Sequence, residues 1–279
     1  MKKMIKETNS DQSKQKLFIH NDDILFPGNK DLMITNATYF GANGWLIEFS
    51  SLKILIDPWL RGDLTFDPAG WIIRGQLKEI FDTPKGIDLI LLTQGLPDHT
   101  HRETLKLFDL NTPIIGSENA CRIVKEIGFI NVKEIKPGNR LEFRNIEIMA
   151  TKGAPIPAPE NGYIIKSSVN SIYIEPHGFV DESIEHQKID IVISPVVNIG
   201  LPFIGSFIKG EEAIRKLDKL LEPKYLLSST IGGKIAFKGL LGNLINQDNI
   251  KNDVINIISD DCIFIEPIPG KRYKLEINI

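Results

Sequence analysis

The chain has 279 residues, which is enough to bury a substantial core in one compact domain. Hydrophobic residues make up 42% of it and charged residues 25%, a composition that argues against disorder, a fibre or a disulfide scaffold. Its formal net charge of -3 gives no overall basic field that would attract phosphate backbones, so we expect no nucleic-acid partner.

The N-terminal segment is polar and rich in lysine, without the apolar core of a signal peptide. No run in the chain reaches the about 18 apolar residues that a membrane-spanning helix needs. Cys121 and Cys262 lie far apart and lack the spacing of a zinc site, so we expect reduced, buried thiols. These features predict a polar arm over residues 1–32, a single domain over residues 33–279, and a cytoplasmic protein that is not integral to a membrane.

From residue 33 onwards, short β-rich runs alternate with turn residues, and helical spacing follows in two places. In the first half we expect strands over residues 34–40, 45–49, 53–56, 88–92, 114–115 and 132–135, and helices over residues 102–108 and 117–127. The first three strands are expected to be antiparallel neighbours. Residues 61–84 contain glycines and prolines among apolar residues, which indicates a long excursion of the kind that often forms a functional lid.

Strands dominate the middle of the chain, and helices return near its end. We expect strands over residues 140–143, 146–151, 162–166, 171–174, 189–194, 225–228 and 273–277, an apolar loop over 200–210, and helices over 211–221 and 248–259. Two sets of strands, each followed by helices, predict an α/β (α+β) protein. The architecture that fits is a four-layer αββα sandwich of two mixed sheets flanked by helices.

Histidine is scarce, with five residues in the chain, yet two of them stand two positions apart at a strand end. His99 and His101 lie beside Asp98, directly after the buried strand expected at residues 88–92. Strand ends hold side chains rigidly while they face solvent. Aspartate and histidine supply the oxygen and nitrogen ligands that zinc, iron or manganese accept, so this cluster is a candidate metal site.

A third histidine, His177, follows the strand expected at residues 171–174, with Glu175 two positions before it. If Asp98, His99 and His177 converge, they form a two-histidine, one-carboxylate set with open positions for water or substrate. Such an ion would support metal-assisted hydrolysis. Glu175 and His101 would then act as general acid or base, or would orient the ligands.

The same residues also fit a purely structural interpretation. Asp98 could cap the following helix, with His99 and His101 as solvated residues of its first turn and His177 in a tight turn. Asp57, at a strand end before a proline, could orient a ligand histidine or accept hydrogen bonds from its own loop. Ligand types alone do not separate these interpretations.

Three runs of sequence resemble the opening half of the metallo-β-lactamase superfamily. They are Trp45-Leu46-Ile47-Glu48, then Ile54-Leu55-Ile56-Asp57-Pro58, then Ile87-Asp88-Leu89-Ile90-Leu91-Leu92-Thr93 ahead of Asp98-His99. The resemblance extends over about residues 34–235. The branch that the chain most resembles contains stand-alone cytoplasmic hydrolases and lipid-directed phosphodiesterases. Within it, the Gln-Gly-Leu and Glu-Pro-His forms resemble divergent hydrolase-like proteins of cyanobacteria and plants.

The resemblance implies that one of the family's two metal sites is lost. The family motif reads T-H-x-H-x-D-H, in which Gln94 and Leu96 replace the first two histidines while Thr93, Asp98 and His99 match. The family's later histidines would fall near residues 152–154 and 229, and neither place holds a histidine.

His177 falls at or next to the position of the family's bridging aspartate. The resemblance therefore implies at most one ion, zinc, iron or manganese, held by Asp98, His99 and His177. Gln94 could coordinate through its carbonyl, hold a water, or bond to neighbouring backbone.

These observations lead to two main hypotheses. The first is a metal-dependent hydrolase with a small-molecule ester or phosphodiester substrate, including lipid-like ones. The apolar loops at residues 201–208 and 235–245 would line its access path or pack on each other. The second is a non-catalytic binding or scaffold protein that kept the fold after losing the metal site. A metal-free acid/base pair of His99 and Asp98, or a redox role for a lone iron, are further alternatives.

Overall fold

The computed structural model describes most of the chain, namely residues 32–65, 74–77, 79–155, 158–201, 205–230, 235–238, 246–247 and 251–278. Of the arm expected over residues 1–32, only the last residue falls within these stretches, as the first residue of a strand. None of the described helices is long and apolar enough to cross a membrane.

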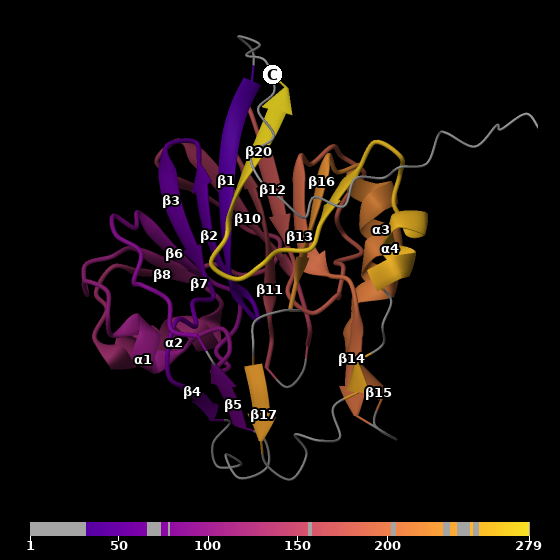
Figure 1. The fold of residues 1–279 in the computed structure, drawn as a ribbon. Coiled ribbons are helices and arrows are strands. Elements are labelled where there is room, and N and C mark those ends of the chain that lie inside the picture. Colours follow the sequence, from indigo (N-terminus) through magenta and orange to yellow (C-terminus); the bar gives the residue numbers. More distant parts are fainter. Residues whose placement is uncertain are drawn as a thin grey trace, which may run out of the picture.

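The first seven-stranded sheet has the order β20-β1-β2-β3-β6-β7-β8 (Figure 1). Its strands are β1 (Leu32–Gly41), β2 (Gly44–Phe49), β3 (Leu52–Ile56), β6 (Leu89–Leu92), β7 (Ile114–Gly116), β8 (Val132–Glu134) and β20 (Arg272–Asn278). The expected antiparallel pairing of the first three strands is confirmed, and β6 then joins β3 in parallel. The C-terminal strand β20 pairs with β1, so the two ends of the described chain meet in one sheet.

The second seven-stranded sheet has the order β19-β16-β13-β12-β11-β10-β9. Its strands are β9 (Arg140–Phe143), β10 (Ile146–Lys152), β11 (Asn161–Lys166), β12 (Ser171–Ile174), β13 (Ile191–Pro195), β16 (Tyr225–Ser229) and β19 (Ile263–Ile265). Strands β9 to β12 pair antiparallel, whereas β12, β13, β16 and β19 run parallel. Both sheets are therefore mixed.

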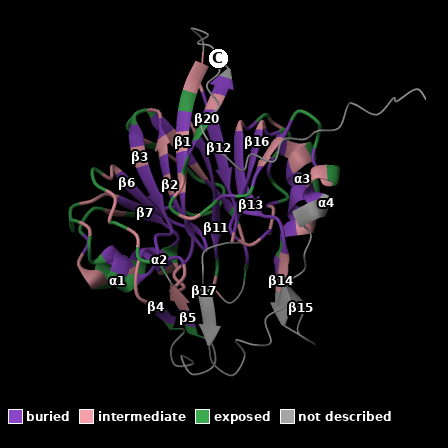
Figure 2. Ribbon diagram, in the orientation of Figure 1, coloured by how far each residue is buried: buried purple, intermediate pink, exposed green. Residues whose placement is uncertain are grey.

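Three clusters of buried apolar residues define the layers. The largest lies between the two sheets and contains residues of both. A second packs α3 (Gly210–Leu221) and α4 (Lys251–Ile257) on the outer face of the second sheet. A third packs α1 (Arg102–Leu105) and α2 (Glu118–Ile127) on the outer face of the first sheet. The expected αββα sandwich is confirmed, with buried strands inside and exposed loops outside (Figure 2).

Strand β6 illustrates how the sequence specifies this arrangement. Leu89 and Leu91 belong to the cluster between the sheets, whereas Ile90 and Leu92 belong to the cluster under α1 and α2. A strand that is buried on both faces requires an uninterrupted apolar run. The polar segment that follows β6 therefore begins where the buried part of the sheet ends.

The expected excursion over residues 61–84 contains more regular structure than its sequence suggests. Strands β4 (Asp63–Thr65) and β5 (Arg74–Leu77) pair with each other, and β5 also pairs with β17 (Ile235–Lys238). These short strands include a glycine and several polar residues, so no period-2 alternation marks them.

The expected apolar loop over residues 200–210 is likewise mostly a hairpin. It consists of β14 (Asn198–Leu201) and β15 (Gly205–Lys209), with β18 (Asn246–Gln247) beside β14. Most side chains of the two segments expected to line an access path, residues 201–208 and 235–245, lie outside the described part of the chain.

Helix α1 is shorter than the expected helix over residues 102–108, because the chain continues as tight turns. The backbone N–H of Leu107 donates to Thr104, and that of Phe108 donates to Leu105, three residues back instead of four. Helix α2 matches its expected range and ends at Gly128, whose φ of 115° is in the left-handed region that favours glycine.

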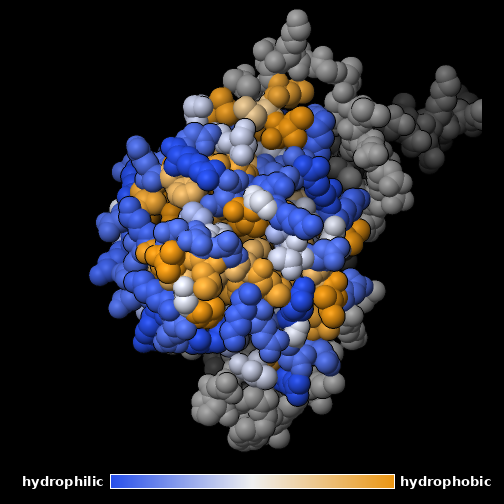
Figure 3. Space-filling view, turned by 90° about the vertical axis from the view of Figure 1, so that its left-hand side faces the viewer, coloured by the Kyte–Doolittle hydropathy of each residue, from blue (hydrophilic) through white to orange (hydrophobic). Residues whose placement is uncertain are grey.

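The surface on the first-sheet side, over α1 and α2, mixes apolar and hydrophilic side chains (Figure 3). Among the described residues, Ile80 and Ile130 are the most exposed large apolar side chains. Exposed apolar residues of this kind are normal on soluble folds.

Candidate metal centre

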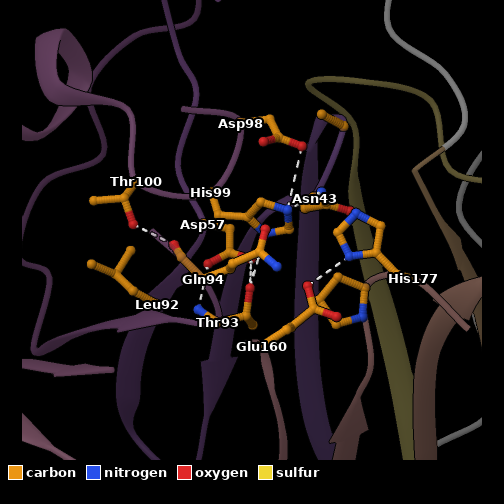
Figure 4. A network of polar contacts seen from close by, with 12 residues as sticks. Asn43, Asp57, Leu92, Thr93, Gln94, Asp98, His99, Thr100, Glu160 and His177 are labelled. Carbon is orange, nitrogen blue, oxygen red and sulfur yellow. Dashed lines mark hydrogen bonds and ion pairs between the residues drawn. The ribbon is translucent and has the colours of Figure 1, made fainter. Parts of the chain in front are cut away.

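Two segments from different sheets meet at the candidate site. The loop at residues 93–101 joins β6 to α1, and the turn at residues 175–178 follows β12. One donor atom from each of Asp98, His99 and His177 lies within 4.8 Å of the other two (Figure 4). The two imidazole rings have their centroids 5.0 Å apart. The convergence expected for these three residues is therefore present.

His99 is fully buried and is held from behind by Asp57. Its Nδ1 lies 2.8 Å from Asp57 Oδ2, and its Nε2 lies 3.3 Å from Asp98 Oδ2. Burial alone would lower the pKa of His99, but the carboxylates of Asp98 and Asp57 raise it well above its usual value. A carboxylate bonded to one ring nitrogen fixes the tautomer and leaves the other nitrogen free to bind a metal.

Asp57 orients a ligand histidine, as one of the two interpretations of its sequence position suggested, and it also accepts hydrogen bonds from the loop after β6 instead of from its own loop. Its Oδ1 accepts the backbone N–H of Thr93 at 2.8 Å, and its Oδ2 accepts the Thr93 hydroxyl in addition to His99. Burial raises the pKa of Asp57, while His99 and Thr93 act in the opposite direction. Asp57 has a φ of 40°, in the left-handed region of backbone conformation. Aspartate tolerates this region better than most residues other than glycine.

His177 is held by a second buried carboxylate. Its Nδ1 lies 2.6 Å from Glu160 Oε1, and the other oxygen of Glu160 accepts the backbone N–H of Ala154 at 3.1 Å. Burial alone would lower the pKa of His177, but Glu160 raises it. As in His99, a carboxylate occupies Nδ1, so Nε2 is the nitrogen left for a ligand.

Glu175 lies behind the same turn rather than among the donors. Its carboxylate accepts the backbone N–H groups of His177, at 3.2 Å, and of Gly178. Burial and the nearby charge of Glu160 raise the pKa of Glu175 to about 7. The contacts of Glu175 shape the turn that carries His177, which fits the orienting role expected as one of its two alternatives.

His101 is not one of the three converging residues. It is the N-cap of α1, where its Nδ1 accepts the backbone N–H of Thr104 at 3.2 Å. Its Nε2 lies 3.3 Å from the carbonyl oxygen of Asp63, and burial lowers its pKa. The helix-capping role that the structural interpretation gave to Asp98 thus belongs to His101, and both His99 and His101 are buried instead of solvated.

One buried oxygen without a hydrogen-bond partner indicates that these residues suit a cation. Asp98 Oδ1 is buried and has no hydrogen-bond partner among the described residues. The charges of His99 and His177 lower the pKa of Asp98 against the opposing and larger single effect of burial, so the group is an anion. In a tetrahedral site, donors at ~2.0–2.2 Å from zinc lie about 3.3–3.6 Å from one another. His99 Nε2 and Asp98 Oδ2 are already 3.3 Å apart, and the three donors all lie within 4.8 Å, so binding requires a closure of the cluster by about 1 Å. The donor set fits one metal ion.

The positions of the family's other metal site are occupied by structural contacts. Gln94 Nε2 donates to the carbonyl of Ala158 at 2.7 Å, which is the backbone bond anticipated for its amide. Ser229 Oγ accepts the indole N–H of Trp45 at 3.4 Å. Leu96 offers no donor atom, so the loss of that site expected from the sequence agrees with these contacts.

Sequence reasoning missed two polar neighbours of the histidines. Glu160 precedes His177 by 17 residues and follows a proline-rich stretch that predicts only a loop. Asn43 lies in the turn between β1 and β2, with its Nδ2 3.3 Å from His99 Nε2. No local motif marks either residue, because each reaches its histidine through the strand order of one sheet: Glu160 precedes β11, which pairs with β12, and Asn43 lies in a turn of the sheet that contains β6.

Comparison with solved structures supports the architecture. An isothiocyanate hydrolase from Delia radicum gut bacteria matches with a TM-score of 0.66 at 16% identity, covering 87% of this chain and 99% of that one. A metallo hydrolase from Ignicoccus hospitalis matches with a TM-score of 0.57 at 16% identity, covering 88% and 100%. The diiron β-hydroxylase of Streptomyces venezuelae matches with a TM-score of 0.58 at 17% identity, covering 90% of this chain and 55% of that one. At these identities the likeness establishes the fold alone.

Sequence comparison identifies the family. No curated protein matches the chain. The family described as "Beta-lactamase superfamily domain" matches residues 36–229, which is more than half of the chain and includes both ligand-bearing segments. With the αββα sandwich and the Asp98, His99 and His177 cluster in place, the chain belongs to the beta-lactamase superfamily and has the metallo-β-lactamase fold.

Proposed function

We propose that the protein is a metal-dependent hydrolase that holds a single ion with Asp98, His99 and His177. One observation supports this most directly. Each imidazole has its Nδ1 bonded to a buried carboxylate, Asp57 or Glu160, which fixes the ring and leaves Nε2 as the nitrogen where a metal ion would replace a proton. This carboxylate-histidine arrangement is typical of metal ligands. Solvated histidines in a turn would not need a buried carboxylate to orient them.

The residues of the chain would divide the work as follows. Asp98, His99 and His177 bind the ion, while Asp57 and Glu160 keep both imidazoles in the correct tautomer and orientation. Glu175 fixes the turn behind His177 through its backbone hydrogen bonds. When bound, the ion would supply Lewis-acid chemistry that polarises the scissile group and lowers the pKa of water. Three protein donors leave at least one position open for water or substrate.

Several finer proposals accompany this function. The substrate class is an ester or phosphodiester, including lipid-like molecules, and zinc is one of three candidate ions with iron and manganese. Residues 33–279 form one domain, because β20 at the C-terminal end pairs with β1. Cytoplasmic location is supported by two buried cysteines that form no disulfide. The Gln-Gly-Leu and Glu-Pro-His forms suggest a divergent branch resembling hydrolase-like proteins of cyanobacteria and plants.

Metal analysis of protein purified without chelator tests the proposal. We expect about one equivalent per chain, lost in His99→Ala and in His177→Ala. His186→Ala is the matched control, because His186 is an exposed histidine that pairs with Glu222, away from the three candidate ligands. Absence of bound metal at micromolar zinc, iron and manganese would overturn the proposal. Metal-loaded protein is then assayed with a p-nitrophenyl ester and with bis(p-nitrophenyl) phosphate, and turnover that is absent from both ligand variants is the expected result.

The non-catalytic binding protein remains the second candidate. It is favoured by Gln94, Leu96 and Ser229, which stand where the family has metal-binding histidines. Stoichiometric metal without turnover of any ester or phosphodiester would favour it, since the ion would then serve structure or binding.

A further inference from the structure

The side chain of Gln94 ends in an unexplained buried oxygen. The residue is fully buried, and its Nε2 donates to the carbonyl of Ala158 at 2.7 Å. Its Oε1 has no hydrogen-bond partner within the described part of the chain. Leaving a buried carbonyl oxygen unpaired destabilises the folded protein. A native site that tolerates this arrangement usually has a ligand, an ion or a water for the oxygen.

The orientation of this amide is fixed by its surroundings. Rotating it by 180° would place Oε1 against the carbonyl oxygen of Ala158, and two acceptors repel each other. The backbone is also held, because the hydroxyl of Thr100 donates to the Gln94 carbonyl at 2.6 Å and the N–H of Asn161 donates to the Thr93 carbonyl at 3.0 Å. Oε1 is therefore the end of the amide that is not tied to the protein.

The second orphaned oxygen of the site lies on the same loop. Asp98 Oδ1 is also buried and unpaired among the described residues, four positions after Gln94. In the view of Figure 4, the side chain of Gln94 extends from its backbone towards the middle of the group of labelled site residues. Both orphaned atoms are acceptors, so another acceptor cannot satisfy them, whereas a cation can satisfy both. Amide carbonyl oxygens are established ligands for the harder divalent ions, including manganese.

We propose that Gln94 Oε1 is a fourth donor to the ion held by Asp98, His99 and His177. The inference rests on the proposed function and adds a neutral oxygen ligand at a position where the family has a histidine. Ions such as manganese accept six ligands, so four protein donors would still leave positions open for water or substrate. Replacing an imidazole with an amide oxygen moves the donor set towards harder ions. The protein's affinities for zinc and for manganese should therefore differ less than they would with a histidine at position 94.

The metal affinities of the wild type and of three variants test the role of this oxygen. They are measured by competition with a chromophoric chelator. Gln94→Leu removes the oxygen and is expected to lower manganese affinity by about tenfold or more. Gln94→Glu keeps an oxygen but loses the donor to Ala158, and it should bind at least as tightly as the wild type. Gln94→His should raise zinc affinity more than manganese affinity. The visible spectrum of cobalt(II)-loaded protein should change in Gln94→Leu, because the ion loses a ligand.

A neighbouring amide provides the matched control. Asn119 Nδ2 donates to the carbonyl of Pro159 at 3.2 Å, a tether next to that of Gln94 but without an orphaned oxygen. Asn119→Ala should therefore leave metal affinity and the cobalt spectrum unchanged. Circular dichroism confirms that each variant is folded before its affinity is interpreted.

The outcomes separate this inference from the proposed function. If the wild type binds metal and Gln94→Leu binds it equally well with an unchanged cobalt spectrum, only the role of Gln94 is overturned. If Gln94→Glu is as weak as Gln94→Leu, the tether to Ala158 matters instead of the oxygen, and the role of Gln94 as a ligand is also overturned. If the wild type binds no metal, both proposals fall together.

Discussion

Two segments supply the candidate ligands, the loop at residues 93–101 and the turn at residues 175–178. In both, a buried carboxylate orients a histidine, but the two carboxylates differ in what else they hold. In each, the Nδ1 of a histidine is bonded to a buried carboxylate from a distant part of the chain. Asp57 holds His99 and also accepts both the N–H and the hydroxyl of Thr93, so one carboxylate orients the ligand and builds the loop. On the other side these tasks are separated, since Glu160 holds His177 and Glu175 shapes its turn.

Because Asp57 has both roles and Glu160 and Glu175 have one each, mutations can separate protein stability from metal binding at the turn but not at the loop. Removing Asp57 affects the ligand and the loop at once. Removing the negative charge of Glu160 affects the ligand, while the turn keeps its own carboxylate in Glu175. The predictions below test this contrast, from the largest expected effect to the smallest.

Asp57→Ala should destabilise the protein by about 3–5 kcal/mol and abolish metal binding. The substitution leaves Thr93 N–H and the His99 ring without their buried partner, and breaking a buried ion pair from one side has this magnitude. Unfolding in urea measures the effect. Asp57→Asn is the control, because asparagine accepts the positive φ and can still accept from Thr93, so it should recover much of the stability. Stability of Asp57→Ala within 1 kcal/mol of the wild type would contradict the shared role.

Glu160→Gln should lower metal affinity by ~10–100-fold with little change in the urea midpoint. Its amide oxygen can keep the bond from Ala154 N–H, so its NH₂ group faces His177 Nδ1 and forces the ring proton onto Nε2, the nitrogen needed for the ion. Titration calorimetry with zinc or manganese measures the change. Glu182→Gln, an exposed carboxylate near the same turn, is the control and should bind as the wild type does. Equal affinity in Glu160→Gln and the wild type would remove Glu160 from the site.

His101→Ala should cost only about 1 kcal/mol and leave metal affinity unchanged. His101 caps α1 by accepting the N–H of Thr104, and loss of an N-cap has this typical cost. The measurement pairs a thermal melt with the metal titration, and His177→Ala serves as the contrasting variant that loses metal while keeping the cap. A drop in turnover of a hundredfold or more at wild-type metal occupancy would instead restore the acid/base role expected for His101 from the sequence.

Much of the fold could be predicted because its signals are local. A strand buried on both faces, such as β6, requires a continuous apolar run, and α2 ends at a glycine that its C-cap needs. Strands β5 and β14 were missed because each has only four residues and no sustained alternation. Each pairs with a neighbour in sequence, β4 or β15, and also with a strand far along the chain, β17 or β18, which no local pattern predicts.

The candidate site was predictable only in its ligands. Asp98, His99 and His177 are marked by residue type and by their position after strands, whereas Glu160 and Asn43 are not. The partners of His99 come from 42 and 56 residues away, through the turn after β3 and the turn before β2. Which carboxylate stands behind which histidine is decided by strand pairing within each sheet, because β3 pairs with β6 and β11 pairs with β12. The packing of the two sheets then brings the two histidines together.

The smallest expected effect concerns the two cysteines, which report separately on the two halves of the molecule. Cys121 lies on α2 beside the first sheet, and Cys262 belongs to the apolar cluster behind the second. Burial raises the pKa of Cys121 to about 11, so at pH 8 only ~0.1% of it is thiolate, and iodoacetamide should not label it on the timescale of minutes. Because the shift is upward, labelling of the folded protein should rise about tenfold per pH unit between pH 8 and 10.

Cysteine labelling at pH 8, followed by mass spectrometry, also distinguishes the role of Asp57 from that of Glu160. Asp57→Ala loosens the loop against which α2 packs, so Cys121 should react sooner than Cys262. Glu160→Gln should leave both thiols as protected as in the wild type, because the turn at residues 175–178 keeps the hydrogen bonds of Glu175. Equal labelling of both cysteines in Asp57→Ala would mean that the loop unfolds only together with the whole domain, and the two halves would then be one cooperative unit.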